Sequence, residues 1–459
     1  MTADRAPNFA ARLAGIARRQ PEQPALVWNG GALTWREVEA RAGGFARQLA
    51  REGVAPGDVV ALLLPNTPGF VAALWGGLAL GATVAPLNPL LAGEERDRIL
   101  DHLAPKAVID AAPAGESRPL PAAPDVTAPA IILYTSGSTG QPKGAVLSHA
   151  ALAAANESWA GPVMGLTQAD RVLAALPLAH SFGLNGALLA PLLAGATVVL
   201  QERFSPEETL RAIERHRVSV FPGVATMFSR ILESPALAKA DGSSLRLAVS
   251  GAAPCPWALA REWRQRTGVR IVRGYGMTEL FRPISYLAAE PGDLPDSIGR
   301  AVPGVTLRLV DGELWIRTPA AMDGYLRAPE ETAAVLADGW FRTGDLATIS
   351  ADGFVSIVGR KRELILRGGY SVVPGEVEAA LLAHPAVAEA AVLGVAHAEL
   401  GEEVAAFVTL RPGARAAAEE LVAFCRERLA GYKYPRRITI VGALPKSATG
   451  KVLKGKLKS

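Results

Sequence analysis

Short apolar runs alternate with longer amphipathic stretches along most of the chain. Asp58–Leu64 carries the run Val-Val-Ala-Leu-Leu-Leu, which is typical of a buried strand, and Thr67–Leu80 follows as a helix packed behind it. The alternation recurs further along, at Arg171–Leu176, Gly186–Leu193, Thr197–Leu200, Pro206–His216 and Val218–Phe221. Strands and helices that alternate in this way predict an α/β fold with mostly parallel sheets covered by helices.

The pattern changes twice towards the C-terminus. After about residue 296, short strands at Val305–Val310, Glu313–Arg317 and Phe354–Val358 are separated by Gly, Asp and Pro, which predicts a small antiparallel or barrel-like unit. Beyond Gly359-Arg-Lys-Arg362 the remaining helical and strand patterns suffice for a separate α+β domain. We therefore predict an N-terminal domain over residues 1–360 and a mobile C-terminal domain over residues 361–459.

Composition narrows the class of protein. A chain of 459 residues is too long for one compact core, and 49% hydrophobic with 20% charged residues is ordinary for a globular protein. The 48 basic and 44 acidic residues nearly balance, so charge gives no reason to expect a nucleic-acid partner. Cys255 and Cys425 form neither a disulfide framework nor a metal-ligand spacing, which predicts a reducing, cytoplasmic location.

Two long stretches without charge have the length of a membrane span, Phe70–Leu91 and Val172–Leu200. Prolines and polar residues interrupt both, so we expect buried segments of the α/β core and no integral membrane span. The N-terminal residues also lack the apolar centre of a signal peptide.

The strongest candidate for chemistry is the run Tyr134-Thr-Ser-Gly-Ser-Thr-Gly-Gln-Pro-Lys-Gly144, which follows the apolar strand Ile131–Leu133. Glycines let the backbone approach a polyphosphate closely, while hydroxyls and Lys143 supply hydrogen-bond donors and charge. The order differs from the Walker loop, in which Gly-Lys-Ser/Thr leads directly into a helix. A plain Gly/Ser/Thr surface loop is the alternative, and the closing Pro142-Lys143-Gly144 disfavours it.

A second candidate is Arg273-Gly-Tyr-Gly-Met-Thr-Glu279, after the strand Val269–Val272. Tyr275 is suited to stack on a purine, and Glu279 is suited to hold a hard cation such as Mg²⁺ through oxygen. An ordinary turn at a strand end remains the alternative for this motif taken alone.

Two further motifs lie nearer the C-terminus. In Phe341-Arg-Thr-Gly-Asp-Leu346, Asp345 is suited to accept hydrogen bonds from both ribose hydroxyls, with a further contact from Arg360; a turn aspartate is the alternative. In Leu444-Pro-Lys-Ser-Ala-Thr-Gly-Lys-Val-Leu453, Lys451 follows a Thr-Gly turn, from which its ammonium could reach an α-phosphate. Without its neighbours Lys451 would be read as an exposed tail lysine.

The four motifs in this order resemble those of the adenylate-forming superfamily, which contains acyl-CoA synthetases, peptide-synthetase adenylation domains and luciferases. The resemblance spans roughly Thr34 to Lys454. It implies that a carboxylate and ATP form an acyl-adenylate and pyrophosphate, after which a thiol displaces AMP. The implied cosubstrates are ATP, Mg²⁺ and, as acyl acceptor, CoA.

The resemblance also assigns roles to residues of this chain. The catalytic set is Lys451, Glu279 as the magnesium ligand, Thr278, Lys143 and His180. The residues implied to bind ATP are Thr135, Ser136, Gly137, Ser138, Thr139, Gly140, Lys143, Gly251, Ala252, Gly274, Tyr275, Gly276, Met277, Thr278, Asp345, Arg360 and Lys451. The implied acyl pocket comprises His180, Phe182, Asn185, Phe221, Gly223, Val224, Gly251 and Gly276, with His180 either a gate or a structural histidine. After rotation about a hinge at Arg362, the CoA tunnel would be lined by Arg367, Gly368, Gly369 and Tyr370.

The nature of the acid is open at this stage. The run Val220–Phe228 and its neighbour His180–Gly186 are mostly apolar, which favours a fatty or other apolar acid. A separate carrier protein as acceptor and a dicarboxylic, malonate-like acid held by Arg282 are the alternatives. A non-catalytic relative is disfavoured because Lys451 and Glu279 are both present. The chain departs from the family in a shorter linker between Asp110 and Tyr134 and in a trimmed region over residues 305–319, so any dimer contact that depends on those surfaces stays open.

Overall fold

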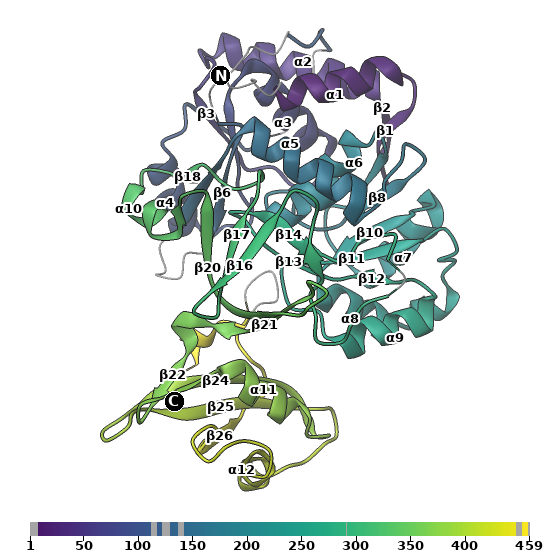
Figure 1. Ribbon diagram of the computed structural model, residues 1–459. Coiled ribbons are helices and arrows are strands. Elements are labelled where there is room, and N and C mark those ends of the chain that lie inside the picture. Colours follow the sequence, from purple (N-terminus) through teal and green to yellow (C-terminus); the bar gives the residue numbers. More distant parts are fainter. Residues whose placement is uncertain are drawn as a thin grey trace. The chain divides into compact units, whose positions relative to one another are not determined.

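The computed structural model describes residues 8–111, 117–121, 129–135, 142–290, 292–446 and 452–457 (Figure 1). The predictions for Ser136, Gly137, Ser138, Thr139, Gly140 and Lys451 lie outside these residues. The chain divides into two compact units: the first comprises Met1–Thr306 and Ile316–Phe341, and the second comprises Leu307–Trp315 and Arg342–Ser459. Each unit is described separately below.

One sheet of the first unit carries the predicted phosphate loop. Its six strands lie in the order β18 (Gly324–Tyr325), β7 (Lys143–Leu147), β6 (Ile131–Thr135), β4 (Thr83–Pro86), β3 (Val59–Leu62) and β5 (Ala107–Ile109). Strands β3 to β6 run parallel, whereas β7 is antiparallel to both β6 and β18. Because Thr135 pairs with Lys143, the two ends of the loop are neighbours in the sheet.

Capping residues mark the N-termini of two helices of the first unit, α2 (Trp35–Arg51) and α3 (Pro68–Leu80). α2 starts in a capping box formed by Thr34 and Glu37. α3 has Thr67 as its N-cap, and Gly81 ends it in the left-handed conformation. All of α3 from Phe70 to Ala79 is buried, as expected for a helix behind the strand at 58–64. The unit also contains α1 (Phe9–Arg19), α4 (Gly93–Leu103) and α10 (Pro329–Val335).

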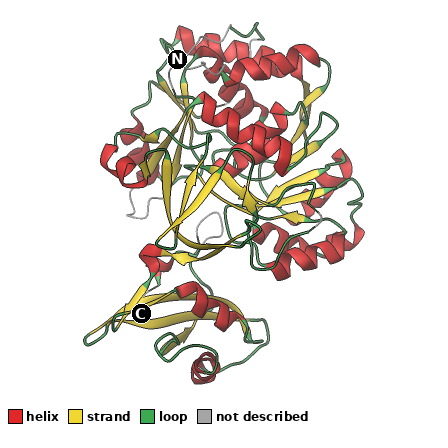
Figure 2. Cartoon of the chain, viewed as in Figure 1, coloured by secondary structure: helices red, strands yellow, loops and turns green. Residues whose placement is uncertain are grey.

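A second sheet of this unit has seven strands in the order β12 (Ile271–Val272), β11 (Leu247–Ser250), β10 (Val220–Gly223), β8 (Arg171–Ala174), β9 (Thr197–Leu200), β1 (Pro24–Trp28) and β2 (Gly31–Thr34). Its strands are parallel except for the antiparallel β1–β2 pair. The helices that alternate with them are α5 (His149–Ser158), α6 (Ala190–Leu193), α7 (Pro206–His216), α8 (Ala225–Glu233) and α9 (Trp257–Thr267). Figure 2 shows these helices flanking the strands, which confirms the predicted α/β alternation.

Three short segments complete the first unit around its candidate site. They are two π-helices, η1 (Trp159–Val163) and η2 (Gly183–Leu189), and a small antiparallel sheet of β13 (Gly274–Met277), β14 (Phe281–Ser285) and β15 (Arg300–Ala301). A 3-10 turn, η3 (Pro235–Lys239), follows α8. Within the described ranges, no helix is both long and apolar enough to cross a membrane. The two charge-free stretches fold as the expected core segments.

The second unit begins with strands from the predicted small-strand region. β16 (Thr306–Val310), β17 (Glu313–Arg317) and β20 (Trp340–Ile349) are neighbours in one sheet, and β21 (Val355–Arg360) pairs with β20. The short strand β19 (Leu336–Ala337) and the first two residues of β20, with which it pairs, belong to the first unit. A 3-10 turn, η4 (Lys361–Glu363), follows β21.

The rest of the second unit is the predicted α+β arrangement. Its sheet is ordered β23 (Tyr370–Val372), β22 (Ile365–Arg367), β25 (Gly401–Leu410) and β24 (Val387–His397), with β26 (Arg437–Ile440) also on β25. α11 (Pro374–Leu382) and α12 (Ala418–Arg426) contribute Val377, Leu381, Leu421 and Cys425 to its buried core. The chain ends with a bridge between Lys446 and Val452 and the turn η5 (Lys454–Lys456).

Candidate active site

A tight hairpin presents Glu279 in the first unit. β13 and β14 pair closely, with Met277 opposite Phe281, so that Thr278 and Glu279 lie in the connecting turn. A Cβ atom on Gly276 would lie 1.9 Å from the carbonyl oxygen of Phe281, so only glycine permits this approach. Gly276 therefore permits the tight turn that positions the Glu279 carboxylate.

The Glu279 carboxylate accepts a hydrogen bond from Tyr325, whose Oη lies 2.7 Å from Oε1. Burial, together with the neighbouring Glu279, raises the pKa of Tyr325, so the phenol stays protonated and donates. The Lys143 ammonium lies 5.1 Å from the centre of the Tyr325 ring, a cation–π contact. Three side chains from β7, β18 and the hairpin turn thus meet at one place.

The residues around Glu279 fit a magnesium ion. Among the described residues, Glu279 has no ion-pair partner, and no group of three His, Cys, Asp or Glu side chains forms a metal site of its own. Mg²⁺ is commonly bound through one or two carboxylates together with substrate phosphates and water. A lone carboxylate beside the end of a phosphate loop matches that donor set.

The segment after β8 carries His180 beside the same turn. The Ser181 and Thr278 hydroxyl oxygens are 3.4 Å apart, which joins this segment to the Glu279 hairpin. Phe182 donates its backbone N–H to Nδ1 of His180 at 3.2 Å, so the imidazole proton lies on Nε2. Burial lowers the pKa of His180, which leaves the ring neutral at pH 7.

An aromatic stack lies next to Phe182. The Trp159 and Phe182 rings are 5.5 Å apart and inclined by 24°, and a Cβ atom on Gly251 would lie 3.1 Å from the Phe182 ring. Trp159, which begins η1, did not emerge from the sequence patterns because a distant segment brings it here. The predicted acyl-pocket residues Phe182 and Gly251 are therefore in contact with aromatic side chains.

Other predicted pocket residues are held by the core. Asn185 is fully buried; its amide nitrogen donates to the carbonyl oxygen of Ser181 at 2.7 Å, and its Oδ1 accepts from Asn156 at 2.9 Å. Phe221 is buried among Phe228 and Trp263, with ring centres 5.3 and 6.4 Å away. This packing gives Asn185 and Phe221 structural roles, and their contact with an acyl group stays a prediction.

The remaining predicted nucleotide and acyl residues border these elements. Gly223 ends β10 and Val224 is the N-cap of α8; Gly251 and Ala252 follow β11, where Ala252 has a φ of +62°. Gly274, Tyr275 and Met277 lie in β13, where Tyr275 is half-buried. Their ligand contacts stay predictions.

Arg282 is buried and bonded to the protein itself. Its guanidinium donates to the carbonyl oxygens of Ser250 (2.8 Å) and Val272 (3.2 Å) and to the Ser285 hydroxyl (2.9 Å). Burial lowers the pKa of Arg282 to about 9, which leaves it charged at pH 7. It also lies 5.0 Å from the Trp159 ring. These bonds at the ends of β11 and β12 support the structural interpretation of Arg282 over recognition of a second carboxylate.

In the second unit, the structure brings Asp345 and Arg360 together. They are paired in register across β20 and β21, and Nε of Arg360 lies 3.0 Å from the buried Asp345 carboxylate. Beside them Glu313 accepts the Gly344 N–H at 3.0 Å and forms an ion pair with Lys361 at 3.1 Å. Sequence reasoning singled out Asp345 and Arg360 as ribose contacts, which stay predictions. It missed Glu313, which lies in the run Gly312-Glu-Leu-Trp315.

The predicted hinge and tunnel residues also lie in the second unit. Arg362 is exposed in η4, and Arg367 makes a bidentate ion pair with Glu403 at 2.6 and 3.0 Å. Gly368 and Gly369 form the turn between β22 and β23, and the exposed Tyr370 ring stacks on Tyr432 at 4.5 Å. Their roles towards CoA stay predictions.

The described residues on either side of Lys451 contact each other. Lys446 pairs with Val452, and Leu453 donates its N–H to the Pro445 carbonyl oxygen at 2.8 Å. Lys454 forms ion pairs with Glu363 at 3.2 Å and Glu378 at 2.8 Å. The residues that flank Lys451 are thus bonded to the protein, whereas Lys451 itself lies outside the described residues.

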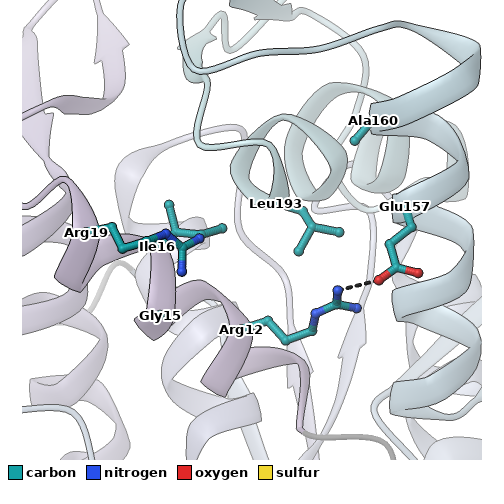
Figure 3. A pocket seen from close by; sticks show the side chains of 7 residues that line it. All are labelled: Arg12, Gly15, Ile16, Arg19, Glu157, Ala160 and Leu193. Atoms are coloured by element: carbon teal, nitrogen blue, oxygen red, sulfur yellow. Dashed lines mark hydrogen bonds and ion pairs between the residues drawn. The ribbon is translucent and has the colours of Figure 1, made fainter.

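A cavity of about 470 Å³ lies in the first unit (Figure 3). It is bordered by α1, α5, η1 and α6, and Arg12 and Glu157 form an ion pair across it. Its lining residues are Arg12, Gly15, Ile16, Arg19, Glu157, Ala160 and Leu193. None of them belongs to the predicted catalytic or binding set, and no catalytic role is assigned to this cavity.

Comparison with known proteins agrees with the motifs. The model of the family described as "AMP-binding enzyme" matches residues 13–121 and 110–326, and that of its C-terminal domain matches residues 376–451. The chain belongs to the AMP-binding enzyme family. A feruloyl-CoA synthase of Amycolatopsis is 37% identical, with 96% of each chain covered. A long-chain-fatty-acid–CoA ligase of Bacillus subtilis is 33% identical, with 97% of this chain and 93% of that relative covered.

Solved structures show the same fold. ATP-bound MatB from Rhodopseudomonas palustris is 31% identical with a TM-score of 0.91, covering 98% of this chain and 97% of MatB. A benzoate CoA ligase from Burkholderia xenovorans is 31% identical with a TM-score of 0.87, covering 99% and 100%. The amide bond synthetase McbA from Marinactinospora thermotolerans is 29% identical with a TM-score of 0.87, covering 98% and 99%. The family and fold predictions are confirmed, and with them an AMP-forming acid–CoA ligase that uses ATP, Mg²⁺ and CoA.

Proposed function

We propose that this ligase activates an apolar carboxylic acid and transfers the acyl group to CoA. The observation that carries the proposal is the aromatic contact of Phe182 with Trp159 beside Gly251. Aromatic side chains offer a large apolar surface and favour a flat or aliphatic acyl group over a charged one. The bonds that engage Arg282 support an apolar acid over a dicarboxylic one.

The residues divide the work of the first half-reaction. A carboxylate oxygen of the acid attacks the α-phosphorus of ATP, the bond to the β-phosphate oxygen breaks, and pyrophosphate leaves. Lys143 and the phosphate loop would hold the leaving phosphates, and Glu279 would hold Mg²⁺, which supplies positive charge to the phosphate oxygens when bound. Asp345 and Arg360 would bind the ribose, and Lys451 would hold the two reacting anions in line.

The second half-reaction replaces AMP by the thiol of CoA. The thiol sulfur attacks the carbonyl carbon of the acyl-adenylate, its proton is lost to solvent, and AMP leaves. His180, with an uncharged ring, would act as a gate beside the acyl group. After a movement about the hinge at Arg362, the path of the thiol would be lined by Arg367, Gly368, Gly369 and Tyr370. CoA as the acyl acceptor is favoured by the relatives named CoA ligases. The cytoplasm stays the expected location of the protein.

The proposal is tested by pyrophosphate release from the purified chain with ATP and Mg²⁺. The panel of acids comprises benzoate and cinnamate types, medium and long fatty acids, malonate and an amino acid, each with and without CoA. We expect turnover with apolar acids and thioester formation only when CoA is present. Preference for malonate would contradict the substrate class, and acyl transfer to a carrier protein or to an added amine in place of CoA would contradict the acceptor.

A further inference from the structure

We propose that Tyr325 is a positioning residue that orients Glu279 for the magnesium ion and Lys143 for the phosphates of ATP. The inference rests on the proposed function, and it adds a residue that the four sequence motifs do not contain. Its basis is the meeting of three side chains: the Tyr325 hydroxyl on Glu279 at 2.7 Å and the Lys143 ammonium 5.1 Å from the Tyr325 ring.

The hydroxyl constrains which oxygen of Glu279 can take a cation. Oε1 accepts the Tyr325 hydrogen bond, and among the described residues no ion-pair partner occupies the carboxylate. A carboxylate on a turn can rotate about three side-chain torsions, so a fixed donor on one oxygen selects the orientation of the other.

The backbone around Tyr325 holds the same three elements in register. Tyr325 pairs with Ala145 in β7, and Leu326 donates its N–H to the carbonyl oxygen of Gly144 at 2.8 Å. Met322 donates its N–H to the backbone carbonyl oxygen of Glu279, also at 2.8 Å. β18 therefore links the strand that leaves the phosphate loop to the turn that carries the carboxylate, and Tyr325 repeats this link with its side chain.

The two parts of the tyrosine predict two separable defects. Tyr325→Phe keeps the ring beside Lys143 and removes only the donor to Glu279. Tyr325→Leu removes both. We expect the phenylalanine variant to need about tenfold more Mg²⁺ for half-maximal pyrophosphate release, the effect of losing one hydrogen bond to a charged group, with the KM for the acid unchanged.

The deciding measurement is the affinity for ATP by titration calorimetry, once with Mg²⁺ and once with EDTA. Tyr325→Phe should weaken ATP binding about tenfold with Mg²⁺ and leave binding in EDTA unchanged. Tyr325→Leu should weaken both, because the contact of Lys143 with phosphate does not depend on the metal. An unchanged or lowered requirement for Mg²⁺ in Tyr325→Phe would overturn the inference, since the phenol would then be neutral towards the ion or would compete with it.

Thr332→Val is the matched structural control. The Thr332 hydroxyl oxygen accepts the backbone N–H of Tyr325 at 2.9 Å, so its loss loosens the same segment but leaves the phenol in place. We expect this variant to keep the Mg²⁺ dependence of the wild type, and the same shift in both variants would reduce Tyr325 to a fold-stabilising residue. Wild-type ATP binding that ignores Mg²⁺ would also overturn the inference. Failure of every acid in the activity screen would leave the calorimetry intact and contradict only the proposed substrate.

Discussion

The acidic site residues of the two units have opposite charge environments. In the first unit, Glu279 meets a neutral hydroxyl and, among the described residues, no cation. In the second unit, Asp345 is 3.0 Å from the Arg360 guanidinium, and its neighbour Glu313 is paired with Lys361. No cation of the described residues pairs with the Glu279 carboxylate, whereas the charges of Asp345 and Glu313 are balanced by Arg360 and Lys361.

This difference matches two kinds of ligand. A carboxylate without an internal cation favours an external one, because the ion gains a charge that no side chain has neutralised. A carboxylate whose charge is balanced still has lone pairs that accept hydrogen bonds from neutral hydroxyls such as those of a ribose. The charge environment thus supports Glu279 as the metal ligand and Asp345 as the sugar ligand.

The largest expected effect is that of Lys451, the residue proposed to hold the substrate carboxylate and the α-phosphate during adenylation. Lys451→Ala should lower acyl-adenylate formation about a thousandfold, since a donor aimed at developing charge is lost, and should leave thioester formation from supplied acyl-adenylate largely intact. The two half-reactions are measured separately, with the exposed Lys456→Ala as control. Equal loss of both half-reactions would contradict a role in the first step.

Glu279→Gln should lower pyrophosphate release about a hundredfold, because the amide keeps the shape but loses the charge that attracts the cation. The loss should shrink as Mg²⁺ is raised, and a titration of rate against Mg²⁺ checks this. Glu262→Gln, on the exposed side of α9, is the matched control. A loss that is independent of Mg²⁺ would indicate a structural role for Glu279 and remove one side of the comparison.

Asp345→Asn should raise the KM for ATP about tenfold with little change in kcat, as expected when binding contacts common to the ground and transition states are lost. Wild type should also discriminate against 2′- and 3′-deoxy-ATP, and the variant should not. Asp352→Asn, in an exposed turn of the same unit, is the control. If the variant still discriminated against the deoxy analogues, the ribose would be bound elsewhere.

The smallest effect is expected for Lys361→Ala. Its partner Glu313 is nearly buried but the Lys361 side chain is 57% exposed, so the ion pair should contribute less than about 1 kcal/mol to the free energy of unfolding. Urea denaturation measures this change. A rise in the KM for ATP as large as that of Asp345→Asn would show that the ion pairs of the second unit act together on the nucleotide.

Sequence patterns predicted the elements well and singled out the motif residues, because both depend on short-range order. The ligand contacts of the motif residues stay predictions. The strand at 58–64 and the helix behind it follow from local runs. Asp345 and Arg360 were singled out by motifs at fixed spacing, but the ion pair between them was not predicted. Tyr325, Trp159 and Glu313 could not be found in this way. Each comes to its site through contacts between segments far apart along the chain, and a lone Tyr, Trp or Glu carries no local signal.

Phe221 shows a different limit. Every residue of β10 is buried, so the strand lacks the alternation that would distinguish a side chain facing the pocket from one facing the core. The apolar run was sufficient to predict a wall near the acyl group, but the packing of Phe221 on Phe228 and Trp263 appears only in three dimensions. Arg282 is the converse case. Its position beside the Glu279 motif suggested a ligand contact, but its guanidinium donates to carbonyl oxygens at strand ends.

The anchoring of Lys143 has a consequence for the entropy of nucleotide binding. Lys143 is the first residue of β7, where it pairs with Thr135, and the strand continues between β6 and β18. Ordering Lys143 against a phosphate therefore costs little backbone freedom, and the loss falls on the side chain, at most about 2 kcal/mol for a lysine. The Tyr325 ring already restricts that side chain in the free enzyme, so part of this cost is met during folding and is absent when ATP arrives.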